Sequence, residues 1–201
     1  MKIESYDENG NSIIEEKGEL VCTEPFVSMP IYFWNDENGI LYHKAYFDYF
    51  PKVWRHGDYI RITNRGGVIV YGRSDSTLNP GGVRIGTAEI YRVVEEMEEI
   101  NDSVVVGLSK KDDVQVVLFV VLKKGIELNN ILDLKIKEKI RISLTPRHVP
   151  QVIHEIKEVP VTLNGKKVEI AVLKTLNGEP VKNVESLLNP SSLNQFKDMK
   201  I

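Results

Sequence analysis

The stretch from Gly72 to Tyr91 reads GRSDSTLNPGGVRIGTAEIY and separates two differently patterned parts of the chain. At its centre, Asn79-Pro80-Gly81-Gly82 is a strong turn signal, because proline and glycine interrupt helices and strands. Thr87 can cap a helix, and an apolar i, i+3, i+4 pattern begins at Ile90. The stretch therefore predicts a turn-rich junction that leads into a helix.

The part before the junction has the pattern of β-structure. Glu19–Cys22 is a short candidate strand that ends at a proline-containing turn. The segments Tyr59–Thr63 and Gly67–Tyr71 flank Asn64-Arg65-Gly66, which is the arrangement of a β-hairpin. The aromatic residues around Trp54 are interpreted as the core of this part.

The part after the junction mixes strands and helices. Val114–Leu122 is almost entirely apolar and rich in valine, which predicts a strand that is buried on both faces. A helix is expected over Leu128–Leu144, and a short one after Gly165. The tail after Gly178 shows no core pattern apart from two leucines, Leu187 and Leu188. These elements predict an α+β fold.

Composition excludes several classes of protein. The chain has 201 residues, a formal net charge of −3 and 42% hydrophobic residues, so a packed core is expected and nucleic-acid binding by bulk positive charge is not. A single cysteine, Cys22, cannot form an internal disulfide or a cysteine-rich zinc site. No apolar run reaches the roughly 20 residues of a membrane span, and the first residues lack a signal-peptide pattern. We therefore expect a cytoplasmic protein with no nucleic-acid or membrane partner.

Three segments carry candidate site residues. Asp58 follows a glycine, and a carboxylate at such a turn can accept both hydroxyls of a ribose, although an ordinary turn aspartate is the alternative. Arg73 and Arg84 flank the glycine-rich junction and suit phosphate oxygens; surface arginines on a twisted hairpin are the alternative. Lys166 follows Gly165 and can reach a growing negative charge, or it is simply solvated.

Together these segments resemble, in the right order, the C-terminal part of the adenylate-forming acyl-CoA synthetases. The likeness rests on AYFDYFPKVWRHGDYIRIT at 45–63, on the junction 72–91, and on SLTPRHVP at 143–150 followed by the Gly-Lys motif. The tail at 178–198 also fits the acetoacetate-activating subgroup. Two segments of the family are absent, namely its Ser/Thr/Gly-rich phosphate loop and the Tyr-Gly-x-Thr-Glu segment whose glutamate helps to hold Mg²⁺.

The resemblance implies a small β-rich subdomain, a distorted barrel, followed by a compact and mobile α+β domain. The boundaries expected from it are residues 1–72 for the β-rich subdomain, 73–76 for a hinge, 77–178 for the mobile domain and 179–201 for a tail. The resemblance also implies that ATP binds together with Mg²⁺ and that CoA is the co-substrate. The protein ligand of Mg²⁺ is expected in the missing large domain.

The resemblance also implies roles for individual residues. It assigns Asp58, Arg73 and Arg84 to nucleotide binding and Lys166 to catalysis of adenylation. The hinge residue is Asp75.

CoA binding is assigned to two further residues. Gly82 would line the passage for the pantetheine arm, and Arg141 would contact CoA.

The function implied is that of one segment of an acetoacetate:CoA ligase. Such a segment would act on acetoacetate or a similar short acyl acid, and would be inactive without the large N-terminal domain as its partner. The alternative is a stand-alone module that binds a nucleotide, CoA or a protein without catalysis. A folded remnant without function is the third possibility.

Overall fold

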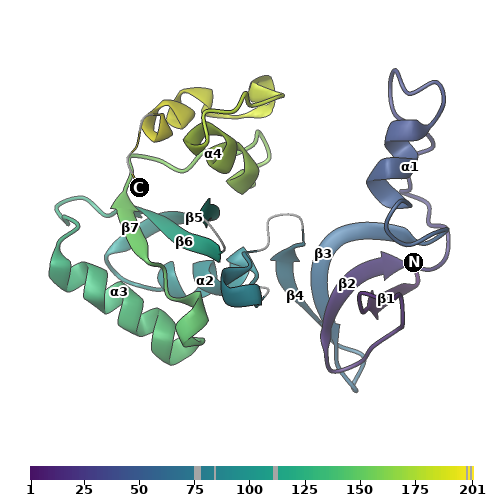
Figure 1. Ribbon diagram of the computed structural model, residues 1–201, viewed down its shortest axis with the longest axis horizontal. Coiled ribbons are helices and arrows are strands. Elements are labelled where there is room, and N and C mark those ends of the chain that lie inside the picture. Colours follow the sequence, from purple (N-terminus) through teal and green to yellow (C-terminus); the bar gives the residue numbers. More distant parts are fainter. Residues whose placement is uncertain (75–77, 84, 111–112, 198, 200) are drawn as a thin grey trace. The chain divides into compact units, whose positions relative to one another are not determined.

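The computed structural model describes residues 1–74, 78–83, 85–110, 113–197, 199 and 201. The chain divides into two compact units, Met1–Asp75 and Ser76–Ile201 (Figure 1). Two of the candidate residues, Asp75 and Arg84, lie outside the described residues. Within the described parts, none of the helices combines the length and apolar character that crossing a bilayer requires.

The first unit is built on an antiparallel sheet in the order β1-β2-β3-β4. The strands are β1 Ile3–Tyr6, β2 Lys17–Cys22, β3 Trp54–Ile62 and β4 Val68–Arg73. The hairpin of β3 and β4 and the strand β2 confirm the sequence prediction. The described strands leave β1 and β4 as the two edges, so this is an open sheet and the expected distorted barrel is not closed.

A helix that the sequence pattern did not predict, α1 Ile40–Tyr46, lies beside this sheet (Figure 1). The carboxylate of Asp36 accepts hydrogen bonds from the first-turn amides of Leu41 and Tyr42, at 3.0 and 2.8 Å. Tyr42 and Tyr46 are four residues apart and so share one face of the helix. Tyr46 stacks on Trp54 with ring centroids 3.6 Å apart. The aromatic cluster at Trp54, which is itself buried, therefore forms as predicted, but through a helix.

The second unit contains a mixed sheet in the order β5-β6-β7 (Figure 1). Its strands are β5 Ile100–Lys110, β6 Asp113–Leu122 and β7 Val152–Glu155, and its helices are α2 Thr87–Val94, α3 Asn130–Ser143 and α4 Glu169–Leu176. β5 and β6 are antiparallel, whereas β6 and β7 are parallel. The α+β class predicted from the sequence is confirmed.

Both faces of β6 are covered, as the valine-rich run predicted. Val116, Leu118 and Val120 pack with α2 and α3 on one face. Val117 and Phe119 pack with α4 and the end of the chain on the other. Alternate residues of a strand point to opposite faces, so a strand between two layers must be apolar throughout.

The tail after α4 belongs to this second core, which the sequence pattern did not show. It forms two short 3-10 helices, Val184–Ser186 and Pro190–Phe196. Phe196 is fully buried and meets Phe119 edge-to-face with ring centroids 5.0 Å apart. Leu188 is 63% exposed, so only one of the two expected core leucines is buried.

Candidate functional site

Asp58 and Arg73 face each other in the first unit. They are opposite residues of β3 and β4, and strand pairing therefore fixes their separation. One guanidinium nitrogen, Arg73 Nη1, lies 3.9 Å from Asp58 Oδ2 and donates to the carbonyl of His56 at 3.3 Å. The His56 ring also contacts the Asp58 carboxylate through Nδ1. The Arg73 side chain is 48% exposed and that of Asp58 is 17% exposed, so the guanidinium lies at the surface beside a partly buried carboxylate.

Gly57 shapes the backbone beneath this pair. Its φ of +86° lies in the left-handed region, which only glycine adopts at little cost. A Cβ at this position would lie 2.7 Å from Arg73 Nη2. The glycine therefore provides both the bend between His56 and Asp58 and the space that the arginine occupies.

A partly buried ion pair joins three segments of this unit. Arg55 Nη2 lies 3.2 Å from Glu19 Oε2 and donates to Ser74 Oγ at 3.0 Å. Ser74 Oγ in turn donates to Glu19 Oε1 at 2.9 Å. Glu19 is only 5% exposed, so these bonds satisfy a carboxylate that would otherwise be costly to bury. Sequence reasoning missed this cluster, because a charged residue in a strand is usually read as exposed.

The glycine-rich loop of the second unit is held by two charged side chains. Gly81 has a φ of +56°, and its amide donates to Asp113 Oδ1 at 2.7 Å. Its carbonyl accepts from Arg147 Nη1 at 3.1 Å, and the Pro80 carbonyl accepts from the same nitrogen at 3.4 Å. The hydrogen bond from the Gly81 amide, followed by one from Val114, lowers the pKa of Asp113 below its ordinary 3.8. The loop that contains Gly82 is thus fixed by residues that follow it by more than thirty positions.

Lys166 stands at the end of a tight turn. Gly165 has a φ of +74°, and its amide donates to the Thr162 carbonyl at 2.8 Å. The Lys166 carbonyl accepts from the Thr162 amide at 2.8 Å. The Lys166 side chain is exposed and makes no ion pair with any residue that the structure describes. Its ammonium is therefore available for a ligand.

The C-terminal tail supports the side of this turn that precedes Gly165. The amide of Leu163 donates to the Ser186 carbonyl at 3.0 Å, and the amide of Leu188 donates to the Val161 carbonyl at 2.9 Å. The side-chain oxygen of Asn189 accepts from the Val161 amide at 3.0 Å. Residues 184–196 are therefore part of what supports the loop of Lys166.

Lys167, on the side of the turn that follows Lys166, bonds to residues at the end of α2 and in β5. Its Nζ donates to Glu95 Oε1 at 2.5 Å, to Ser103 O at 2.6 Å, and to the carboxylate of Asp102. It also lies 4.6 Å from the centroid of the Tyr91 ring. A lysine after a glycine-lysine pair gives no sequence signal for such a role, because lysines are usually exposed.

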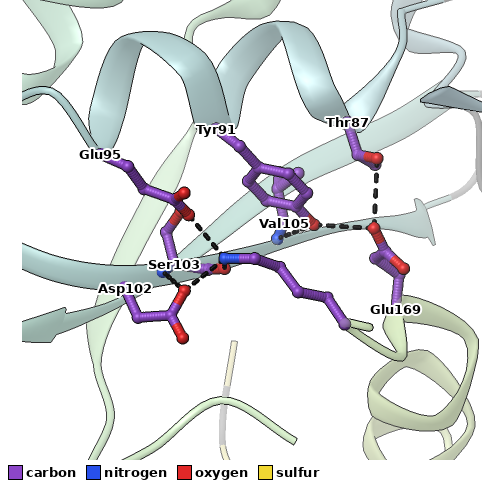
Figure 2. A network of polar contacts seen from close by, with 8 residues as sticks. Thr87, Tyr91, Glu95, Asp102, Ser103, Val105 and Glu169 are labelled. Atoms are coloured by element: carbon purple, nitrogen blue, oxygen red, sulfur yellow. Dashed lines mark hydrogen bonds and ion pairs between the residues drawn. The ribbon is translucent and has the colours of Figure 1, made fainter. Parts of the chain in front are cut away.

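Figure 2 shows Glu95, Asp102 and Ser103 on one side of Tyr91, with Thr87 and Glu169 on the other. The Tyr91 hydroxyl donates to Glu169 Oε1 at 3.0 Å and accepts from the Val105 amide at 3.2 Å. Burial, and then the charge of Glu169, raise the pKa of Tyr91 well above its ordinary 10.0.

Helix α2 begins where the sequence predicted, but Thr87 does not cap it. Its Oγ1 donates to Glu169 Oε1 at 3.2 Å instead. The residue before the helix is Gly86, whose amide donates to the side chain of Glu89 at 2.9 Å. The first turn of α2 is therefore capped by Glu89 and is also tied to α4 through Thr87.

The remaining candidate residue, Arg141, lies in the last turn of α3 with an exposed side chain. No hydrogen bond or ion pair joins its side chain to another residue of the described ranges. Asp58 and Arg73 lie together in the first unit, whereas Gly82, Arg141 and Lys166 lie apart on three elements of the second. Among the described residues, no group of three or more His, Cys, Asp or Glu side chains could hold a metal ion.

Residues 89–166 match the family model of the AMP-binding enzyme C-terminal domain. The chain carries this C-terminal domain of AMP-binding enzymes. The matched residues end at Lys166, and the resemblance to acyl-CoA synthetases inferred from the sequence is confirmed by the relatives that follow.

The relatives of this chain include acetoacetyl-CoA synthetases. That of Rhizobium meliloti is 49% identical over 200 residues, covering 100% of this chain and 31% of the relative. That of Mus musculus is 46% identical, and the match covers 99% of this chain and 30% of the relative. The solved structure of acetoacetyl-CoA synthetase from Streptomyces lividans has a TM-score of 0.91 and 44% identity over 98% of this chain and 30% of its own. The chain thus spans 30–31% of the length of these relatives.

Proposed function

We propose that this chain is the C-terminal segment of an acetoacetate:CoA ligase and supplies the lysine for its adenylation step. The observation that carries the proposal is the loop at Gly165-Lys166, which is anchored on both sides and presents an exposed ammonium that pairs with no residue of the described ranges. Similarity to acetoacetyl-CoA synthetases along the whole chain supports the choice of acid.

In the first step, a carboxylate oxygen of acetoacetate attacks the α-phosphorus of Mg-ATP. The bond to the leaving pyrophosphate breaks, and acetoacetyl-AMP forms. The carboxylate and triphosphate bring several negative charges together, so the ammonium of Lys166 lowers the barrier by stabilising them. The ligand of Mg²⁺ is expected in the part of the enzyme that lies beyond this chain.

The nucleotide would be held by Asp58, Arg73 and Arg84. The carboxylate of Asp58 accepts the two ribose hydroxyls, because an ionised carboxylate has only acceptors to offer. Arg73, which is half exposed beside it, donates to the nucleotide. Arg84 contacts the phosphate oxygens.

In the second step, the thiol of CoA attacks the acyl carbonyl, and AMP leaves. Lys166 must then be withdrawn, and a passage for the pantetheine arm must open. Rotation of the second unit about Asp75 accomplishes both, with Gly82 lining the passage and Arg141 contacting CoA. The fixed backbone at Gly81 keeps this loop in one shape during the rotation.

The partner would be the large N-terminal domain. In the first unit, large apolar side chains between residues 27 and 41 are exposed, with Val27, Ile31 and Trp34 each above 80%. None of the residues of α1 is buried. Exposed apolar patches of this kind mark protein interaction sites.

The test mixes this chain with the N-terminal portion of an acetoacetyl-CoA synthetase and measures AMP formation that depends on acetoacetate, ATP and CoA. We expect turnover in the mixture and none with either part alone. Two folded parts that together give no AMP would contradict the proposal.

A second candidate is a binding module without catalysis, which the length of 30–31% of the relatives favours. Titration calorimetry of the chain with ATP, AMP and CoA discriminates the two. Binding without turnover in the mixture favours the module.

A further inference from the structure

We propose that Lys167 is a positioning residue that fixes the loop of Lys166 for adenylation. The role in adenylation rests on the proposed function. That Lys167 fixes the turn rests on the contacts of its side chain.

The surroundings of the Lys167 ammonium match its bonding capacity. An ammonium carries three donors and no acceptor. The three acceptors around Nζ are Glu95 Oε1, Asp102 Oδ1 and Ser103 O. The side chain is 21% exposed, and its Nζ also lies over the Tyr91 ring. This is a lysine built into the unit rather than a solvated one.

The acceptors lie outside the turn, two in β5 and one at the end of α2. Asp102 and Ser103 are in β5, which pairs with β6 from Asp102 to Lys110. Glu95 follows the last residue of α2, and its Oε1 also accepts from Ser103 Oγ at 2.7 Å. The second strand of the turn is thereby tied to the sheet that forms the centre of the unit.

Neighbouring side chains of an extended segment point to opposite sides. Lys167 pairs with Val161 in an isolated β-bridge, so the segment is extended at this point. Burying Lys167 on the inner side therefore turns Lys166 outward. The described residues of the tail hold the Val161 side of the turn, and Lys167 anchors the other side through its side chain.

Removing the ammonium would also leave two carboxylates facing each other. Glu95 and Asp102 are 34% and 35% exposed, and both contact the same nitrogen. Like charges at this separation repel when the cation between them is lost. The turn would then shift, and Lys166 would lose its position while keeping its charge.

The test compares Lys167→Met with Lys137→Met. Lys137 is a matched control, since it pairs with Asp133 at 2.8 Å on α3 and both side chains are 26% exposed. Hydrogen exchange of the whole chain is measured first. In Lys167→Met we expect the amides of Thr162 and Lys166 to exchange about tenfold faster, with β5 and β6 unchanged. In Lys137→Met the turn should keep its protection.

The second measurement uses the chain combined with the N-terminal portion. Lys167→Met should slow formation of acetoacetyl-AMP by about 10- to 100-fold, the loss that follows when a catalytic group is misplaced by roughly 1 Å. Thioester formation from supplied acetoacetyl-AMP should change less than about twofold, because Lys166 is withdrawn in that step. Lys167→Arg should recover part of the rate, since it retains a cation and donors.

Unchanged exchange in the turn would overturn the proposal. So would loss of protection throughout β5 and β6, or equal losses in both half-reactions, because each of these describes a lysine that only stabilises the unit. If the wild-type mixture makes no acetoacetyl-AMP, the proposed function fails, while the exchange measurement still decides whether Lys167 fixes the turn.

Discussion

The charged pair of the first unit and the lysine loop of the second are positioned by different means. Asp58 and Arg73 are opposite residues of two paired strands, so the backbone ladder sets their distance. Lys166 is on a turn whose two sides are held by the tail and by Lys167. Strand pairing makes the first site local, whereas the second depends on residues distant in the sequence. It follows that remote substitutions should disturb the second site more than the first.

The largest effect that sharpens this comparison is expected for Phe196→Ala. Phe196 is fully buried in the core that joins the tail to β6, so truncation leaves a cavity. The free energy of unfolding of the second unit should fall by about 3–5 kcal/mol. Leu188→Ala, at a residue that is 63% exposed, is the control and should change it little. Urea denaturation of both variants measures the difference, and equal stabilities would contradict the role of the tail.

A smaller effect is expected at two glycines of the first unit, one in β3 and one in the turn between β3 and β4. Gly57 and Gly66 both have a positive φ, at +86° and +78°, so alanine at either costs about 1–2 kcal/mol of backbone strain. Only at Gly57 would the added Cβ also displace Arg73. Gly57→Ala should therefore lower the free energy of unfolding more than Gly66→Ala does, and equal losses by urea denaturation would count against the arrangement described.

The smallest effect is the pH-dependent stability that Asp113 provides through the glycine-rich loop. The hydrogen bond from Gly81 lowers the pKa of Asp113 in the folded chain. The stability that this provides is present above the ordinary pKa of 3.8 and is lost as the pH falls through the lower folded value. Asp113→Asn should therefore be less stable than the wild type at pH 7, with a difference that shrinks in acid. Urea denaturation across that range measures it, and a difference independent of pH would contradict the assignment.

The sequence predicts those features that depend on local patterning. The hairpin of β3 and β4 follows from its turn residues, and the burial of β6 on both faces follows from its unbroken apolar run. Helix α1 was missed, because it has only seven residues and its first amides bond to Asp36, outside the helix. The tail was missed, because its short 3-10 helices bring Leu193 and Phe196 together without an α-helical period.

The candidate site divides in the same way. Motif residues such as Asp58 and Lys166 could be named from the sequence, because turn glycines precede them. Their supports could not. Arg147 and Lys167 act through contacts with Gly81 and with Ser103, and no spacing in the sequence indicates contacts over such separations.

The two half-reactions of the combined enzyme test the central claim most directly, with Lys166→Ala compared with Lys124→Ala. Lys124 is an exposed lysine of the same unit that also adjoins a glycine of positive φ, Gly125. We expect Lys166→Ala to slow pyrophosphate release in the adenylation step by about 10²–10³-fold, as for loss of one charge-stabilising donor. Thioester formation from supplied acetoacetyl-AMP should be nearly unchanged, and Lys124→Ala should match the wild type in both. Adenylation at the wild-type rate without Lys166 would contradict the account.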